Sequence, residues 1–367
     1  MRAKFALAAA LTMSLLTACG DKSATASKEI PTIKVGYIVQ DSVRPGLVVA
    51  AKQLGYYDEE GVNVELVPVD SVPSGIAAVS TRKLDLFSLS VRALSSIAKG
   101  GDETFIGGVA TEGSSLVVSK ENSEIDFRDF HNLKGKVIGK NPADPIELIF
   151  KDYVKESLGA EYTDDYIQWK DFDDNNVLLE AISKGSVDGG FLTTERVWLA
   201  EERGLKEAFD LAEFLPEYLC CRLTSTNATV KEKRDALVAI LRAQIRAEID
   251  YKNDTDKVID ALEEFTKQKR DHIIRYVGVH KDYAVDAFTD FKNPLSTNLM
   301  YNKIKQYDDV SVNFGFYERN PNVDLKEHVD PTLWQDAIKE LIDRYPDVPE
   351  YKELNEFFLK DSSEYWN

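Results

Sequence analysis

Polar and charged side chains recur just after the predicted strands of this sequence, where folds of alternating strands and helices bind ligands. The loops combine hydroxyl, amide, carboxylate and guanidinium groups, which is the set that a site for a small polar molecule requires. Helix capping can account for any one of these residues, but the pattern recurs in six loops. The candidate ligand-binding residues are Gln40, Asp41, Ser42, Arg44, Asp70, Ser71, Ser74, Ser88, Ser90, Arg92, Glu112, Asn141, Asp144, Thr193, Glu195 and Tyr218.

Catalytic chemistry has no comparable support in the sequence. There is no GxSxG elbow, HExxH, phosphate-binding loop or GxGxxG motif, and the four histidines are scattered. Three cysteines are too few for a disulfide scaffold or an iron–sulfur protein. We therefore predict that the protein is not an enzyme and that it holds no cofactor and no metal.

The identity of a bound solute stays open at this level. An arginine fork suits a sulfonate, carboxylate or phosphate, whereas carboxylates suit an amine or a ring nitrogen, and aromatic rings suit a heteroaromatic solute. The basic candidates are Arg44, Arg92, Lys140, Arg196 and Arg222. The acidic candidates are Asp41, Asp70, Glu112 and Glu195. The aromatic candidates are Tyr37, Phe87, Phe191 and Tyr218.

Strands and helices alternate from residue 33 onward, which is typical of crossover units with a parallel sheet. The predicted strands are 33–39, 62–67, 84–89, 104–109, 136–139, 166–170 and 187–192. They form two α/β units in series. The rest of the chain reads as helical, beginning with an apolar helix face over 230–252. This order predicts an α/β fold whose strand ends carry the candidate loops.

The composition is that of an acidic globular protein. The 367 residues carry 45 Lys and Arg against 63 Asp and Glu, which gives a net charge of −18. This length suggests about two domains. A nucleic-acid partner is not expected, because contact with phosphates requires a basic surface.

The N-terminus has the pattern of an export signal. Arg2 and Lys4 precede an apolar stretch at 5–16, which is too short to span a bilayer. The run Leu-Thr-Ala-Cys-Gly that ends at residue 20 resembles the lipobox of bacterial lipoproteins, in which the cysteine carries the lipid. We predict a signal peptide at 1–18, a palmitate-bearing anchor at Cys19 and a linker at 19–32. An ordinary secretory signal is the alternative.

Several segments resemble bacterial ABC-transporter solute-binding proteins of the sulfonate, nitrate, taurine and thiamine-precursor class. The run AAKQLGYYDEEGV at 50–62 is similar to the family's signature of a helix, a turn and a strand. Weaker similarity lies at IKVGY (33–37), LKGKVIG (133–139), GSVDGG (185–190) and HVDPTLW (328–334). The resemblance spans most of the chain that follows the predicted signal peptide.

The resemblance implies a type II periplasmic binding protein fold. Two doubly wound α/β lobes would be joined by two crossover strands and followed by a helical C-terminal extension. Lobe 1 would be 33–118 and lobe 2 would be 119–219, with 220–367 returning to lobe 1. The lobes would enclose a small polar solute and pass it to an ABC permease and its ATPase. The protein would be an exported, membrane-anchored monomer.

Two departures from the family bear on function. Thr194, Glu195 and Arg196 stand where the family often has a run like Trp-Glu-Pro, which puts an aromatic ligand contact in doubt. Thiamine-precursor synthases of similar fold carry a cysteine-rich segment, whereas this chain has Cys220 and Cys221 there, as packed thiols or a vicinal disulfide. The alternative function is an extracytoplasmic enzyme or sensory module on the same two-lobed fold.

Overall fold

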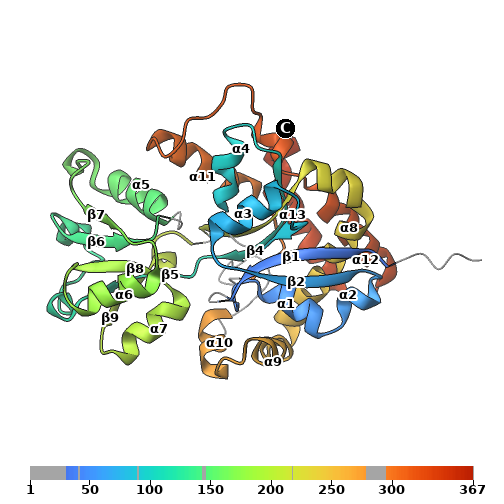
Figure 1. The fold of residues 1–367 in the computed structure, drawn as a ribbon, viewed down its shortest axis with the longest axis horizontal. Helices are drawn as coiled ribbons and strands as arrows, with labels where there is room; N and C mark the ends of the chain where they lie inside the picture. Colours follow the sequence, from blue (N-terminus) through green and yellow to red (C-terminus); the bar gives the residue numbers. More distant parts are fainter. Residues whose placement is uncertain are drawn as a thin grey trace, which may run out of the picture. The chain divides into compact units, whose positions relative to one another are not determined.

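The computed structural model describes residues 30–39, 42–88, 91–142, 146–216, 218–277 and 295–366 (Figure 1). Residues Pro31–Asn367 form one compact unit. The predicted signal peptide at 1–18, the predicted lipid site at Cys19 and most of the predicted linker at 19–32 lie outside the described residues. The candidates Gln40, Asp41, Ser90 and Asp144 lie outside them as well.

The first sheet has five strands in the order β2-β1-β3-β10-β4. Its strands are β1 (Thr32–Ile38), β2 (Asn63–Val69), β3 (Leu86–Phe87), β4 (Glu103–Thr111) and β10 (Leu219–Thr226). β1 is parallel to β2 and β3, and β10 is antiparallel to β3 and β4. The parallel strands therefore end at one edge of the sheet, where their loops meet.

The second sheet repeats this arrangement with the order β7-β6-β8-β5-β9. Its strands are β5 (Ser114–Val118), β6 (Val137–Lys140), β7 (Gln168–Asp171), β8 (Gly189–Thr193) and β9 (Lys206–Asp210). β6 is parallel to β7 and β8, and β5 is antiparallel to β8 and β9. The predicted fold class, two α/β lobes with two crossovers and a helical C-terminal region, is confirmed.

The chain passes between the sheets twice. It leaves the first sheet after β4 through Glu112 and Gly113, and it returns from β9 to β10 through 211–218. β5 therefore lies in the second sheet, although the predicted first lobe runs to residue 118. The lobe limits stay a prediction, because contacts within the chain define one compact unit.

Helices cover both sheets (Figure 1). Beside the first sheet are α1 (Gly46–Gln53), α2 (Tyr56–Glu59), α3 (Val72–Ser80) and α4 (Leu94–Ile97). Beside the second are α5 (Ile146–Leu158), α6 (Asn175–Ser183) and α7 (Thr194–Glu202). Short 3-10 turns lie at Val91–Ala93, Lys120–Asn122, Phe130–Leu133, Gly159–Glu161, Leu211–Glu213 and Leu325–His328.

The C-terminal region adds helices to the first lobe. They are α8 (Asn227–Asn253), α9 (Thr255–Thr266), α10 (Arg270–Val277), α11 (Tyr301–Asn313), α12 (Thr332–Arg344) and α13 (Pro349–Trp366). Trp334 is fully buried and stacks on Phe358 with ring centroids 4.1 Å apart. These helices share one hydrophobic core with the first sheet, whereas the second sheet has an aromatic core and a separate aliphatic one.

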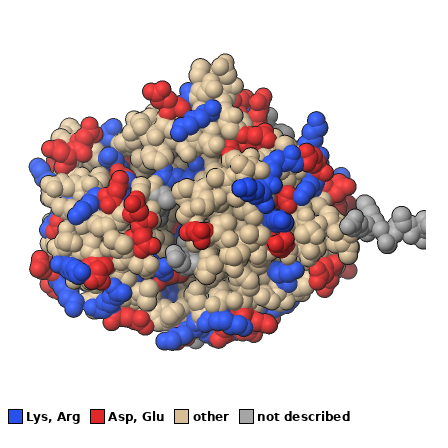
Figure 2. Space-filling model, in the orientation of Figure 1, with Lys and Arg blue, Asp and Glu red and all other residues tan. Residues whose placement is uncertain are grey.

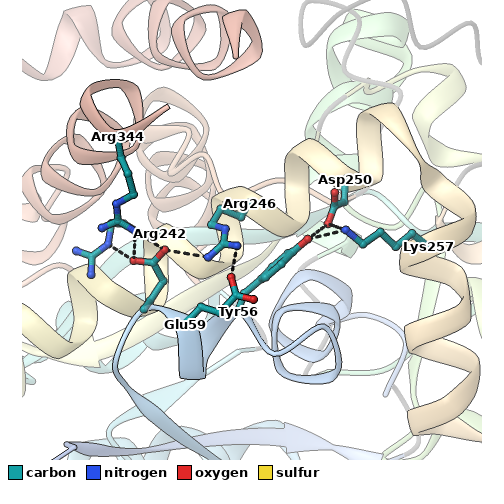
Figure 3. Close-up of polar contacts among 8 residues, drawn as sticks. Tyr56, Glu59, Arg242, Arg246, Asp250, Lys257 and Arg344 are labelled. Atoms are coloured by element: carbon teal, nitrogen blue, oxygen red, sulfur yellow. Dashed lines mark hydrogen bonds and ion pairs between the residues drawn. The ribbon is translucent and has the colours of Figure 1, made fainter. Parts of the chain in front are cut away.

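A buried carboxylate ties the C-terminal helices to the rest of the first lobe (Figure 3). Glu60 follows α2, and its side chain is 1% exposed. It accepts hydrogen bonds from Arg242 Nε at 2.6 Å, Arg246 Nη1 at 3.0 Å and Arg344 Nη1 at 2.7 Å. Burial would raise the pKa of Glu60, but the bonds from Arg242 and Arg344 outweigh it and lower this pKa. We call these four residues the Glu60 cluster.

Candidate functional site

A cavity of about 860 Å3 lies between the two sheets. On one side it is lined by Asp70 and Ser71, which follow β2, and by α3. On the other side are Asn141, which follows β6, and Asp173, which follows β7. These positions follow parallel strands at their carboxyl ends, where open α/β sheets bind ligands. The volume suits an organic molecule.

Helix caps place several of the lining side chains. Ser71 caps α3 by accepting a hydrogen bond from the backbone N–H of Ser74 at 3.3 Å. Asp174 caps α6 by accepting hydrogen bonds from the backbone N–H groups of Asn176 at 2.7 Å and Val177 at 3.1 Å. Ser71 and Asp174 therefore have a structural role as well as a place in the cavity wall.

Two arginines bring positive charge to the cavity. The guanidinium of Arg92 lies over the ring of Phe316, with its carbon 4.3 Å from the ring centroid. Arg196 lies in the first turn of α7 and lines the opposite side. Its Nε is buried and has no hydrogen-bond partner in the described part of the chain. Arg196 is therefore a donor that a solute can use.

A second polar group lies where the chain crosses between the sheets. Arg44 is 5% exposed, and its Nη1 donates to Cys220 Sγ at 2.6 Å. Its Nη2 lies 4.0 Å from Glu195 Oε2, and its guanidinium carbon lies 5.6 Å from the ring centroid of Tyr276. Cys221 Sγ is 3.9 Å from Nη1. We call these five residues the Arg44 cluster.

The Arg44 cluster is charged but sparsely hydrogen-bonded. Burial lowers the pKa of Arg44, but Cys220, Tyr276 and their neighbours raise it well above its ordinary value, so the guanidinium stays protonated. Its Nε and Nη2 have no hydrogen-bond partner among the described residues. Cys220 and Cys221 are buried and form no disulfide, and their sulfur atoms lie 3.0 Å apart.

The structure divides the predicted ligand-binding residues between these two places. Asp70, Ser71, Arg92 and Asn141 line the cavity. Arg44 and Glu195 meet in the Arg44 cluster. Glu112 and Tyr218 lie at the crossovers, where the backbone N–H of Glu112 donates to the carbonyl of Tyr218. Thr193 ends β8 and pairs with Ser114 of β5. The binding roles of all these candidates stay predictions.

Three other candidates have structural surroundings. Ser88 is fully buried and donates to the carbonyl of Gly36, which fixes the end of β3 against β1. Ser74 is exposed and bonds to Ser71 within the cap of α3. Ser42 is buried just before α1. None of the three lines the cavity described above.

Sequence reasoning missed part of the wall. Ser80, Ser95, Ser96 and Phe316 line the cavity without being candidates. Phe316 follows α11, far along the chain from the other lining residues, so no strand-end pattern marks it. The serines lie along helices or between them, where the loop rule does not apply. Arg196 was recognised as a basic candidate but not included among the ligand-binding residues.

The two lobes touch through helices on either side of the crossovers (Figure 1). Arg275 of α10 bonds through Nη2 to Glu201 of α7 at 2.9 Å and to Glu207 of β9 at 3.1 Å. Phe314, which follows α11, lies beneath the ammonium groups of Lys151 and Lys155 of α5, at 5.4 and 5.5 Å. Any separation of the two lobes would break these contacts.

Surface charge does not single out a partner. On the face shown in Figure 2, acidic and basic side chains are interspersed. Within the described residues, no group of three or more His, Cys, Asp or Glu is placed to hold a metal ion. The same part of the chain contains no helix with the length and apolar character needed to cross a membrane.

Comparison with known families matches residues 46–256 to the family model described as NMT1/THI5 like. The match covers more than half of the 367 residues. The chain belongs to the NMT1/THI5-like family. Membership confirms the class that the sequence predicted. A comparison with curated proteins found no match.

Solved structures show the same fold. The periplasmic sulfonate-binding protein SsuA of Methylobacillus flagellatus is 19% identical with a TM-score of 0.66, over 84% of this chain and 94% of that one. The periplasmic nitrate-binding protein NrtA of Synechocystis is 12% identical with a TM-score of 0.68, over 85% and 89%. The desulfurization enzyme DSZB is 11% identical with a TM-score of 0.59, over 85% and 99%. At these identities the NMT1/THI5-like chain shares a fold with both binding proteins and an enzyme.

Proposed function

We propose that the protein is the solute-binding component of an ABC importer, which holds a small organic solute between its two lobes and delivers it to a membrane permease. The observation that carries this proposal is the cavity of about 860 Å3, because polar residues from both sheets line it. A site built from two lobes binds better when they close on the solute, so the solute shifts the protein toward the closed form. Binding proteins of the same fold, SsuA and NrtA, support the proposal.

The solute classes that we propose are sulfonates, taurine, nitrate and thiamine-like pyrimidines. The size of the cavity favours the organic members of this set. Export, attachment to the membrane through a lipid on Cys19 and a monomeric state complete the proposal. In the host cell, Cys19→Ser should move the protein from the membrane fraction to the soluble one. Wild-type protein in the soluble fraction would contradict the anchor.

An enzyme on this fold is the second candidate, favoured by the similarity to DSZB. In the described part of the chain, His131 is exposed beside Asp129, and His328 Nδ1 donates a hydrogen bond to the backbone carbonyl oxygen of Glu103 at 2.7 Å. His272 packs against Trp198. These surroundings are those of structural histidines, which supports the binding protein over the enzyme.

The deciding experiment is a thermal-shift screen of the purified protein against sulfonates, nitrate, amino acids, pyrimidines and flavins, followed by calorimetry. We expect saturable one-to-one binding, with the solute recovered unchanged. Ala77→Trp would place a bulky side chain from α3 into the cavity and abolish binding. The matched control is Ala160→Trp at an exposed position, which should bind normally. A recovered product, or full binding by Ala77→Trp, would contradict the proposal.

A further inference from the structure

Arg44 is a buried, permanently charged residue whose guanidinium has few hydrogen-bond acceptors within the protein. The side chain gives two hydrogen bonds, both from Nη1 to thiols, at 2.6 Å to Cys220 and at 3.9 Å to Cys221, and it has one ion pair at 4.0 Å, to Glu195. Its Nε and Nη2 are buried and receive no acceptor among the described residues. Burying a charge with unmet hydrogen-bonding groups is costly, and thiols are weak acceptors. A protonated guanidinium that lacks acceptors within the protein indicates that an anion from solution can bind to it.

We propose that Arg44 is the anion subsite of the solute site, and that the carboxylate of Glu195 occupies it until a solute arrives. This inference rests on the proposed function, because it assigns one part of the solute to one residue. Glu195 comes from the second lobe and Arg44 from the first, so they meet only across the interface between the lobes. The carboxylate of Glu195 acts as an internal substitute for the anionic group of the solute.

Arg44 does not itself line the cavity, and helix α7 relates the two places. Glu195 and Arg196 are consecutive in the first turn of α7, and Arg196 lines the cavity while Glu195 faces Arg44. A Cβ built on Gly113, at a crossover, would lie 3.8 Å from Arg44 Nη2 and 3.5 Å from Thr194 Oγ1. These are ordinary van der Waals distances, so it is the left-handed φ of +87°, rather than a lack of space, that favours glycine here. Thr193 Oγ1 is a second buried group without a partner among the described residues.

The chemistry of the subsite selects a singly charged oxyanion, a sulfonate or a carboxylate. The Nε and Nη2 groups of one guanidinium form a fork that matches two oxygens of such a group. One guanidinium balances one negative charge. Asp70 and Asp173 line the neighbouring cavity and would oppose a more highly charged anion. A solute that carries one anionic group at Arg44 and an organic body in the cavity fits both places.

The alternative is that Arg44 and Glu195 form an ordinary structural ion pair between the lobes. The ion-pair hypothesis and the subsite hypothesis make opposite predictions. If Glu195 is a structural partner of Arg44, removing its carboxylate costs stability that no added anion restores. If Glu195 holds a ligand subsite, a small oxyanion can take its place. The probes are sodium acetate and sodium methanesulfonate, because they are the two candidate head groups without any organic body.

The experiment measures the Tm of Glu195→Ala in acetate, methanesulfonate and chloride at equal ionic strength. We expect acetate or methanesulfonate to raise Tm by about 2–4 °C over chloride in a saturable way. The double variant Arg44→Met with Glu195→Ala should lose this anion-specific rise. Glu202→Ala on the same helix is the matched control and should show none. Glu195→Gln repeats the test if the alanine variant does not fold.

The outcomes separate this inference from the proposed function. Equal Tm values in all three salts, or a rise that survives the removal of Arg44, would overturn the anion subsite. A solute found in the screen would then still support the importer. Conversely, acetate or methanesulfonate could raise the Tm of Glu195→Ala while no solute binds in the screen. That result would support the anion subsite and overturn the importer assignment.

Discussion

Two arginine-rich regions of this protein treat buried charge in opposite ways. In the Glu60 cluster, three guanidinium groups surround one carboxylate, and Arg242 and Arg246 also reach Glu340 and Glu59 (Figure 3). In the Arg44 cluster, one guanidinium has two thiols, a ring and a carboxylate at 4.0 Å. The Glu60 carboxylate is satisfied within the chain, whereas Nε and Nη2 of Arg44 have no hydrogen-bond partner among the described residues. Under our proposal, it is this incomplete pairing of Arg44, rather than its charge alone, that makes it a subsite for a ligand.

Breaking the satisfied cluster should give the largest effect on stability. Glu60→Ala would leave three arginines, two of them largely buried, around an empty position. We expect the free energy of unfolding to fall by about 3–5 kcal/mol, because removing one member of a buried ion cluster strands the others. Urea denaturation measures this change. The control is Glu59→Ala, whose side chain is 59% exposed and whose loss should have little effect.

Removing Arg196, whose buried Nε donor faces no acceptor among the described residues, should weaken solute binding and leave stability nearly unchanged. We expect Arg196→Ala to weaken the binding of an anionic solute by about 10- to 100-fold, because a charged hydrogen bond is lost. Calorimetry measures the affinity and thermal unfolding measures the stability. Arg203→Ala, just past the other end of α7, is the control. Equal affinities of the Arg196→Ala and Arg203→Ala variants would contradict the idea that the unpaired donor of Arg196 binds the solute.

A second buried carboxylate shows what happens without arginine partners. Glu248 of α8 accepts hydrogen bonds from the backbone N–H and the hydroxyl of Thr297. Burial raises the pKa of Glu248 to about 6, although the bonds from Thr297 lower it. Because the folded pKa is raised, the stabilising contribution is complete below about pH 4.5 and is lost as the pH rises through 6.

Glu248→Gln should therefore remove a pH dependence. The wild type should lose about 2 kcal/mol of stability from this group between pH 4.5 and 7, relative to the variant. Urea denaturation across this range measures the difference. Glu60 should act in the opposite sense, since its lowered pKa gives stability that is lost as the pH falls. A wild-type profile that matches that of Glu248→Gln would show that Glu248 does not titrate here.

The contact between α10 and α7 should give the smallest effect. Arg275 is partly exposed, so its ion pairs with Glu201 and Glu207 are worth little to folding. We expect Arg275→Ala to change the free energy of unfolding by less than about 1 kcal/mol, and to increase the population with separated lobes. Small-angle scattering measures this shift as a larger radius of gyration. An unchanged radius would show that these pairs do not hold the lobes together.

Much of the fold could be predicted from local patterns. The predicted strands at 33–39 and 62–67 are present as β1 (Thr32–Ile38) and β2 (Asn63–Val69). The strand β9 was missed, because KEAFD is short and largely polar, and only Ala208 and Phe209 of this edge strand are buried. β3 pairs over only Leu86 and Phe87, although the apolar run there predicted a longer strand.

The candidate site was harder to predict than the fold. Among the residues predicted from loops after strands, Asp70 and Asn141 line one cavity, and their binding roles stay predictions. Phe316 could not be found in this way, because it reaches the cavity from the C-terminal region. The polarity of Ser74 is equally apparent in the sequence, but its hydrogen bonds stay within the cap of α3.

The class of fold could be predicted from local patterns, because hydrophobic periodicity and turn residues depend on near neighbours in the sequence. Which charged groups find partners depends on the tertiary structure. Arg246 meets Glu60 across 186 positions and Arg44 meets Cys220 across 176, so no local pattern contains either pair. Two crossings between the sheets bring such distant residues together, and their packing leaves Arg44 short of acceptors while Glu60 has three donors.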